Sequence, residues 1–355
     1  MREICILLTG CGAPGANGII NSLRKNNERN IKIIGVDINV NAYGKALVDK
    51  FYKISPANSE KFIDEILDIC LKEKVEVILP IVTKELEIFS KNKEIFEKKN
   101  IKVSVMDIET LSIVNNKGKL LNKLQEIGIK TAKYELAKNI QEVEKSIKSL
   151  GYPNNPVFIK PTFGNGSRGT RLLDSSLSKY ELFFSQKPNS YLIEYEELVE
   201  ILSEKKEIPE MMIMEYLPGT EYSVDILAEN GEILVIACRK ALKILSSIQM
   251  DSIIEKNEKL EKTCKEIVKK LKLSGIFSFD VKENKKGESF ILEMNPRLPA
   301  GIVLTAVAGY NMPYLEIKRL LGEKIEVGSL KYGTKMVRHW EEKFFDEENN
   351  FMEWK

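Results

Sequence analysis

The segment at residues 157–173 reads VFIKPTFGNGSRGTRLL and has the residue types of an anion-binding loop. An apolar run ends at Lys160, whose ammonium group can reach into the loop that follows. Glycines lack a Cβ atom, so their backbone N–H groups can approach phosphate oxygens closely. The candidate phosphate-binding residues of the loop are Gly164, Gly166, Ser167, Arg168 and Gly169. The chain then continues as a strand, which distinguishes the loop from a Walker motif and leaves a plain polar hairpin as the alternative.

The segment at residues 290–301, FILEMNPRLPAG, has the residue types of a site for a hard cation. A strand here places Glu293 and Asn295 on one face, because side chains two positions apart share a face. Asp280 lies in the neighbouring run GIFSFDV, and Mg²⁺ commonly takes one or two carboxylates together with substrate phosphates. Arg297 follows, past a proline that fixes the turn. A surface hairpin with solvated charges is the alternative, but the apolar run before Glu293 is typical of a buried strand.

The segment at residues 213–225, IMEYLPGTEYSVD, has a strand break that suits a nucleoside. A strand ends at Glu215, a Pro-Gly turn follows, and Glu221 opens the next strand. Backbone groups at such a break can pair with an adenine edge, and a carboxylate can accept hydrogen bonds from ribose hydroxyls. A simple hairpin is the alternative for this segment taken alone.

The N-terminal segment TGCGAPGANG fits the dinucleotide fingerprint G-x-G-x-x-G at Gly10, Gly12 and Gly15. It follows an apolar run, and Asp37 ends the next apolar run about 20 residues later, as that fingerprint requires. The fingerprint alone is a weak signal, and an oxidoreductase built on it would leave the segments at 157–173 and 290–301 unexplained.

Strands and helices alternate through the first hundred residues, which predicts a doubly wound parallel sheet. The expected strands are 4–8, 31–36, 75–80 and 101–105, and the expected helices are 16–25, 59–74 and 84–99. The later part of the chain reads as a mostly antiparallel α+β fold. Its expected strands are 157–160, 169–173, 211–215, 222–228, 233–239, 275–282 and 288–294, and its expected helices are 117–127 and 257–271.

The bulk composition narrows the classes of function. Lys plus Arg is 54 against 52 for Asp plus Glu, so the net charge of +2 gives no attraction to nucleic acid or to an acidic membrane. No apolar run reaches the roughly 18 residues of a membrane span, and the N-terminus lacks the layout of a signal peptide. The five cysteines have no metal-site spacing and predict reduced thiols in a cytoplasmic protein. The single histidine, His339, makes a His-based metal site or triad improbable, and a structural role is expected for it.

The three segments, in this order and spacing, resemble the ATP-grasp superfamily, and most closely its carbamoyl-phosphate-synthase-like and amino-acid-ligase-like members. The resemblance covers nearly the whole chain. It implies a pre-ATP-grasp α/β domain at 1–112, an ATP-grasp domain at 113–330 with a lid subdomain at 131–214, and a C-terminal extension at 331–355 that packs on the ATP-grasp core. The N-terminal glycine turn then borders the substrate cleft and binds no dinucleotide.

The resemblance also implies roles for individual residues, with ATP and Mg²⁺ or Mn²⁺ as cofactors. The residues that match the nucleotide site are Lys117, Lys160, Gly164, Gly166, Ser167, Gly169, Glu215, Leu217 and Glu221. Those that match the metal site are Asp280, Glu293 and Asn295, and those that match the catalytic cations are Lys160, Arg239 and Arg297. Glu215 and Leu217 match the adenine hinge, Leu217 through its backbone, and Glu221 matches the ribose acid.

Two segments depart from the family pattern. The run KALKILSSIQMD after Arg239 lacks the second arginine and the glycine of close relatives, so the roles of Lys240 and Lys243 stay open. Residues 191–209 are longer than a minimal linker. The substrate site is expected near the turn at 10–17, the loop near residues 83–85 that leads into the expected helix, and the segment after Arg297. Phe163 is expected in the core, and Arg168 can equally touch phosphate or solvent.

The resemblance implies an ATP-dependent carboxylate–amine or carboxylate–thiol ligase that forms an acyl phosphate on an amino acid or small carboxylate. The expected partners are small molecules, not nucleic acid or a membrane, and a homodimer stays open. Three alternatives remain: a bicarbonate-activating, carbamoyl-type enzyme, an NAD(P)-dependent oxidoreductase, and a non-catalytic nucleotide-binding module. A single copy of the module disfavours complete carbamoyl phosphate synthesis.

Overall fold

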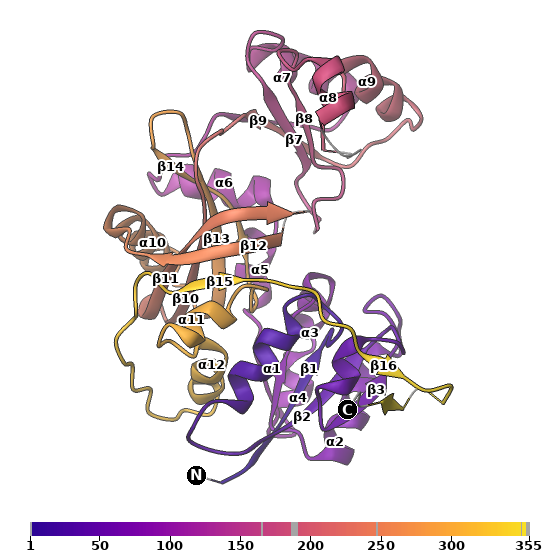
Figure 1. The fold of residues 1–355 in the computed structure, drawn as a ribbon, viewed down its shortest axis with the longest axis vertical. Helices are drawn as coiled ribbons and strands as arrows, with labels where there is room; N and C mark the ends of the chain where they lie inside the picture. Colours follow the sequence, from indigo (N-terminus) through magenta and orange to yellow (C-terminus); the bar gives the residue numbers. More distant parts are fainter. Residues whose placement is uncertain (1, 165, 186–190, 246–247, 349, 353–355) are drawn as a thin grey trace. The chain divides into compact units, whose positions relative to one another are not determined.

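A computed structural model describes residues 2–164, 166–185, 191–245, 248–348 and 350–352 of the chain (Figure 1). The chain divides into two compact units. Unit 1 contains Met1–Ser112, Tyr222–Phe279 and Asn295–Lys355, and unit 2 contains Ile113–Glu221 and Asp280–Met294. The domain and lid boundaries expected from the sequence stay predictions.

Unit 1 begins with a five-stranded parallel sheet of order β3-β2-β1-β4-β5, which confirms the predicted doubly wound fold. Its strands are β1 (Ile4–Thr9), β2 (Ile31–Asp37), β3 (Lys50–Lys53), β4 (Val77–Leu79) and β5 (Lys102–Val103). All six residues of β1 are buried, because helices cover both faces of a parallel sheet and leave no solvent-facing side.

Helices complete this layer and supply its core. They are α1 (Ala16–Arg24), the 3-10 turn η1 (Tyr43–Ala46), α2 (Phe62–Glu73), α3 (Thr83–Lys91), α4 (Lys93–Glu97) and α5 (Ile108–Val114). One buried cluster joins Ile6 of β1 to Ile19 and Leu23 of α1. Separately, Phe62 of α2 packs edge-on against Phe89 of α3, with ring centroids 5.5 Å apart.

The sequence prediction of one helix over 84–99 is wrong, because the segment forms α3 and α4 with a break at Asn92. The Asn92 backbone leaves helical geometry at φ −110° and ψ 13°. Its side-chain amide donates to the carbonyl of Ile88 at 2.8 Å. Asparagine competes in this way for backbone partners, which ends a helix.

A six-stranded sheet follows in the order β14-β13-β10-β11-β12-β15. Its strands are β10 (Glu221–Glu229), β11 (Glu232–Leu245), β12 (Ile248–Glu255), β13 (Gly275–Glu283), β14 (Ser289–Asn295) and β15 (Lys335–Val337). The predicted Asn-Gly hairpin joins β10 to β11, with φ of 50° at Asn230 and 84° at Gly231. The unusual run KALKILSSIQMD belongs to the β11–β12 hairpin, apart from Ser246 and Ser247, which lie outside the described residues.

Helices α10 (Glu258–Lys270), α11 (Val303–Val307) and α12 (Met312–Leu320) complete the described helices of unit 1. Leu304 and Tyr314 from these helices lie in the same core cluster as α1. At the C-terminus, β15 pairs with β12, and β16 (Phe344–Phe345) pairs with β17 (Phe351–Met352).

Unit 2 contains a four-stranded antiparallel sheet of order β6-β9-β7-β8. Its elements are α6 (Lys117–Glu126), β6 (Tyr134–Ala137), α7 (Ile140–Ser149), β7 (Val157–Pro161), β8 (Arg171–Leu173), α8 (Lys179–Ser185), α9 (Tyr195–Ser203) and β9 (Met211–Glu215). Helix α9 accounts for much of the long segment 191–209. Ile147, Ile159, Leu198 and Ile213 join helices and sheet in one buried cluster.

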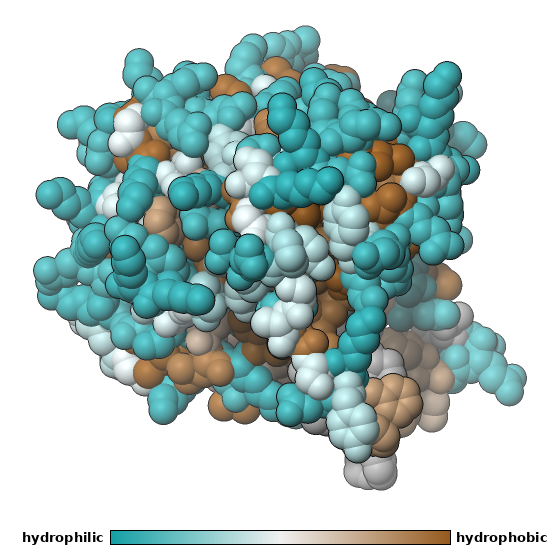
Figure 2. All heavy atoms as spheres, turned by 90° about the horizontal axis from the view of Figure 1, so that it is seen from above, coloured by the Kyte–Doolittle hydropathy of each residue, from teal (hydrophilic) through white to brown (hydrophobic). Residues whose placement is uncertain are grey.

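The surface is predominantly polar where Figure 2 shows it, with smaller hydrophobic areas between hydrophilic side chains. Among the described residues, no helix combines the length and the apolar character that crossing a membrane requires.

Candidate functional site

Lys117 joins two predicted nucleotide-binding segments in unit 2. It is the first residue of α6, which Asn116 caps by accepting the N–H of Lys119 at 2.9 Å. The backbone N–H of Lys117 donates to Thr162 O at 2.9 Å, so the start of α6 is fixed beside the loop after β7. The Lys117 ammonium donates to Gly164 O at 3.1 Å and lies 3.2 Å from Glu293 Oε2.

Lys160 faces the same carboxylate from β7. Its Nζ lies 4.0 Å from Glu293 Oε2, and its side chain is only 6% exposed. Burial lowers the pKa of Lys160, while Glu293, Asp280 and Glu221 act to raise it. The structure therefore brings two predicted cations and one predicted metal-binding acid together from segments far apart in the sequence.

The glycine loop adopts backbone conformations that favour glycine. Gly166 has φ 64° and Gly169 has φ 73°, and even Ser167 adopts φ 55°. These residues are exposed, while Asn165 lies outside the described residues. A Cβ atom at Gly169 would lie 2.8 Å from Cγ of Pro161, so this glycine also lets the loop return past the end of β7.

Phe163 corrects one prediction, because its side chain is 56% exposed and is not part of the core. It directly precedes the exposed glycine loop. The apolar residue type alone suggested burial, although loops lie at the surface regardless of single apolar residues.

The adenine-hinge and ribose candidates lie at the predicted strand break. The carboxylate of Glu215 accepts the backbone N–H of Lys133 at 2.7 Å, and Leu217 is buried. Glu221 opens β10, with Oε2 3.8 Å from Nζ of Lys282. Burial raises the pKa of Glu221, and Lys282 opposes that effect.

The acids of unit 2 suit a metal that arrives with a nucleotide. Among the residues that the structure describes, no three His, Cys, Asp or Glu side chains cluster as a metal-binding group. Asp280 on β13 and Glu293 on the neighbouring strand β14 offer two carboxylates, and Asn295 ends β14 two residues after Glu293. This set fits Mg²⁺, which usually completes its shell with water and substrate phosphates.

Arg239, in unit 1, is held by other protein groups. Its guanidinium pairs with Asp225, with Nη2 3.0 Å from Oδ1, and both residues are buried. Nη1 also donates to Gln249 Oε1 at 2.7 Å. The catalytic role expected for Arg239 stays a prediction, and these contacts indicate a fixed, charge-compensated guanidinium.

Arg297 and the expected substrate loop are both described in unit 1. Arg297 Nε donates to Thr83 Oγ1 at 3.1 Å, and Nη1 donates to Leu298 O at 3.1 Å. Residues 83–85, expected near the substrate site, form the first turn of α3. Glu85 is buried and accepts a hydrogen bond from the Thr9 hydroxyl, and burial raises its pKa to about 7.

The N-terminal glycine turn is packed against protein backbone. A Cβ atom at Gly15 would lie 2.5 Å from the Cα of Ala300, so the glycine admits that segment. Asp37, the fingerprint acid, accepts backbone N–H groups from Gly12 and Asn39, each at 2.9 Å. Gly15 and Asp37 of the fingerprint thus already contact protein groups, at the positions that a dinucleotide would contact.

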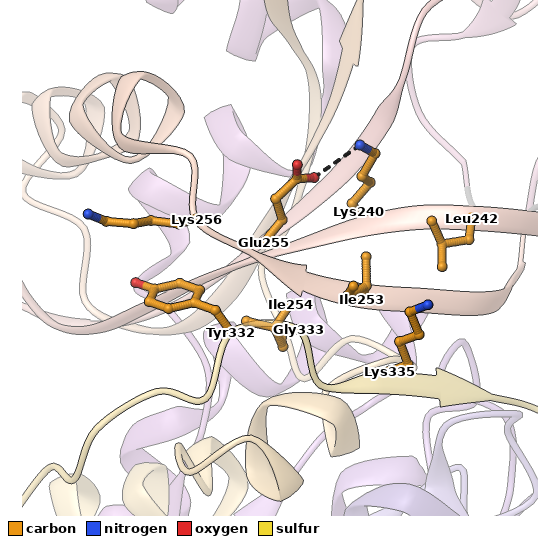
Figure 3. A pocket seen from close by; sticks show the side chains of 9 residues that line it. All are labelled: Lys240, Leu242, Ile253, Ile254, Glu255, Lys256, Tyr332, Gly333 and Lys335. Atoms are coloured by element: carbon orange, nitrogen blue, oxygen red, sulfur yellow. Dashed lines mark ion pairs between the residues drawn. The ribbon is translucent and has the colours of Figure 1, made fainter.

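A surface groove of about 360 Å³ lies on unit 1 (Figure 3). It is lined by Lys240, Leu242, Ile253, Ile254, Glu255, Lys256, Tyr332, Gly333 and Lys335. Lys240 pairs there with Glu255 at 3.3 Å. Successive side chains of a strand point to opposite faces, so Lys240 lies on the other face of β11 from Arg239.

Sequence reasoning missed Lys282 and Arg338. Lys282 lies two residues after Asp280 on β13 and therefore on the same face, which was a usable signal. Arg338 donates from Nε to Gln249 O at 3.1 Å and from Nη2 to Ala300 O at 2.6 Å. The expected structural histidine, His339, follows β15 and is exposed.

Comparison with protein-family models gives two matches. Residues 207–342 match a family described as ATP-grasp in the biosynthetic pathway with Ter operon. Residues 6–104 match a family described as the PylC-like N-terminal domain.

Individual relatives agree with these matches. The chain is 24% identical over 288 residues to the carbamoyl phosphate synthase large chain of Clostridium acetobutylicum, covering 78% of this chain and 25% of that protein. It is 24% identical over 349 residues to a formate-dependent phosphoribosylglycinamide formyltransferase of Wolinella succinogenes, covering 94% of this chain and 80% of that protein. The chain thus spans about a quarter of the synthase large chains that it matches.

A solved structure supports the fold. The biotin carboxylase domain of Hydrogenobacter thermophilus 2-oxoglutarate carboxylase, a dimer solved with MgADP, ADP and bicarbonate, matches with a TM-score of 0.68 and 17% identity. The match covers 93% of this chain and 73% of that one.

Proposed function

We propose that this chain, an ATP-grasp protein similar to carbamoyl phosphate synthase, is an ATP-dependent ligase that joins a small carboxylate to an amine through an acyl phosphate. An amino acid is the favoured carboxylate, and a thiol is the alternative acceptor. ATP with Mg²⁺ or Mn²⁺ is the proposed cofactor pair.

The observation that carries the proposal is the meeting of Lys117, Lys160 and Glu293. The two ammonium groups lie 3.2 Å and 4.0 Å from one carboxylate oxygen, beside the exposed glycine loop. Two lysines and backbone donors suit a phosphate chain, because each brings a positive charge or a hydrogen-bond donor to anionic oxygens. A metal-binding acid in the same place suits the cation that accompanies a triphosphate.

In the proposed reaction, a carboxylate oxygen of the substrate attacks the γ-phosphorus of ATP. The bond to the β-phosphate oxygen breaks, and an acyl phosphate and ADP form. The amine nitrogen then attacks the acyl carbon, phosphate leaves, and the nitrogen loses a proton. Phosphoryl transfer needs mainly alignment and charge neutralisation, which Lys160 and Arg297 are proposed to provide.

Other residues would hold the reactants in place. Glu221 would accept hydrogen bonds from the ribose, and the backbone at Leu217 would bind the adenine edge. Residues 164–169 would cover the phosphates and exclude water, because an acyl phosphate hydrolyses when water reaches it. Asp280, Glu293 and Asn295 would hold Mg²⁺, which when bound neutralises the phosphate oxygens.

The test is phosphate and ADP release from purified protein screened against paired amino acids, small carboxylates and amines. Glu293→Gln should reduce release at least 100-fold at saturating ATP, because it removes one metal-binding charge. Glu288→Gln is the matched control on the same strand hairpin, where Glu288 pairs with Lys130 at the surface, and it should keep wild-type turnover.

The screen also separates the alternatives. Turnover by Glu293→Gln at the wild-type rate would contradict the metal assignment. ATP hydrolysis that depends on bicarbonate alone would favour the carbamoyl-type reaction. Nucleotide binding without turnover by any substrate pair would favour a non-catalytic module. Saturable micromolar binding of NADH would instead revive an oxidoreductase.

A further inference from the structure

Lys282 lies beside the ribose candidate Glu221 in unit 2. It is the penultimate residue of β13, and its side chain is 23% exposed. Its Nζ lies 3.8 Å from Glu221 Oε2 and 6.0 Å from the centroid of the Tyr216 ring. The ammonium group therefore has an anionic partner on one side and the negative face of an aromatic ring within cation–π range.

Backbone pairing fixes this position. Gly219 N–H donates to Glu283 O and Glu283 N–H donates to Thr220 O, each at 2.9 Å. A Cβ atom at Gly219 would lie 2.7 Å from Glu283 O, so only glycine lets the turn approach the end of β13 this closely. The pair between Lys282 and Glu221 is thus built on a hydrogen-bonded frame and not on two freely moving surface chains.

Buried surroundings and a nearby acid act on Glu221, and Lys282 compensates them. Burial and the nearby charge of Glu293 both raise the pKa of Glu221. Lys282 acts against these effects more strongly than Lys160 does. Without Lys282, the carboxylate would lose its main compensating charge and the contact that fixes its orientation.

We propose that Lys282 is a positioning residue for the nucleotide, which holds the Glu221 carboxylate oriented to accept the ribose hydroxyls. Lys282 thereby sets the preference of the site for ribonucleotides over deoxyribonucleotides. The inference rests on the proposed nucleotide site. Lys282 itself has no role in the proposed function described above.

The test measures dissociation constants for ATP, 2′-deoxy-ATP and 3′-deoxy-ATP by calorimetry with Mg²⁺ present. Lys282→Met should weaken ATP binding roughly tenfold, as expected for losing a partly buried charged contact. One of the two deoxynucleotides lacks the hydroxyl that Glu221 would contact. For that nucleotide, Lys282→Met should change the dissociation constant by less than about twofold, because the contact is already absent. Lys282→Arg should recover much of the ATP affinity.

Controls make the outcome specific. Lys285→Met removes an exposed lysine from the turn that follows β13 and should leave all three constants unchanged. In a Glu221→Gln background, Lys282→Met should have little further effect. Equal weakening of ATP and both deoxynucleotides, or no weakening at all, would overturn the role of Lys282. Wild-type protein that binds none of the nucleotides would contradict the proposed function instead.

Discussion

At the scale of single residues, Lys160 is a buried cation whose charge opposes folding. A buried ammonium is unfavourable, and burial lowers the pKa of this lysine in spite of three nearby acids. Replacing a buried charge with an apolar side chain often stabilises the fold. A buried charge that a protein keeps is therefore a candidate for ligand binding. Lys160 is accordingly expected to matter for nucleotide binding and not for folding.

Lys160→Met tests this separation. The substitution should leave the free energy of unfolding unchanged or raise it by up to about 2 kcal/mol, because Lys117 still compensates Glu293. ADP affinity should fall at least tenfold. Denaturant titration and calorimetry measure the two quantities, and a large loss of stability with unchanged ADP affinity would contradict this account.

Glu85 gives a pH-dependent prediction. Its pKa is about 7 in the folded protein against an ordinary value of 4.5. The folded state favours the neutral acid, so the contribution of Glu85 to the free energy of unfolding is fully present below pH 4.5. That contribution is lost as the pH rises from 4.5 through about 7. The difference corresponds to about 3 kcal/mol at most. Glu85→Gln should therefore raise the free energy of unfolding at pH 8 and change it little at pH 4.5.

The matched control for Glu85 is Glu87→Gln on the same helix. Glu87 is exposed and pairs with Lys91, so its substitution should shift stability by less than about 0.5 kcal/mol at either pH. An effect of Glu85→Gln that is the same at both pH values would show that the buried carboxyl does not titrate in this range.

At the scale of elements, close approaches at glycine position the functional side chains. A Cβ atom at Gly301 would lie 2.1 Å from Nη1 of Arg239. The guanidinium cannot move aside freely, because it is buried against Asp225 and donates to Gln249. The absence of a side chain at Gly301 therefore allows the segment after β14 to lie this close to Arg239 of β11.

Gly301→Ala should destabilise the protein by roughly 3 kcal/mol, because displacing Arg239 leaves the buried Asp225 uncompensated. Gly328→Ala is the control, since among the described residues no atom beyond its two chain neighbours lies within 4 Å of the Cβ position there. Denaturant unfolding of the two variants measures the difference. Equal stability of both variants would mean that the guanidinium relocates at no cost.

Apolar runs and turn residues made most elements of the sheets predictable. The β1 run, the Asn-Gly hairpin and the glycine loop are local signals, and each appears in the structure where the sequence predicts it. The strand β3, with sequence KFYK, was missed because it has only four residues, lies at the sheet edge and contains no fully buried side chain that would mark a core strand. The helix break at Asn92 depends on one side-chain contact that no periodicity reports.

The candidate site was predictable in residue type but not in pairing. Lysines after strands and acids in apolar runs could be read directly from the sequence. The shared contact of Lys117 and Lys160 with Glu293 joins segments more than 100 residues apart, so only the fold could reveal it. The burial of Glu85 and the place of Lys282 likewise depend on neighbours that are distant in sequence.

At the scale of the whole molecule, the N-terminal fingerprint and the later segments suggest different ligands. The turn at Gly15 accommodates Ala300, and Asp37 accepts backbone N–H groups. The cations in unit 2 face an acid and an exposed glycine loop. A chain built this way should bind a magnesium–nucleotide complex through unit 2 and should not bind a nicotinamide dinucleotide.

Calorimetric titration of the wild-type chain with ADP, with and without Mg²⁺, and in parallel with NADH tests that claim most directly. The account predicts saturable binding of one ADP per chain that weakens markedly without Mg²⁺, and no binding of NADH. Saturable NADH binding together with no heat from MgADP would contradict it.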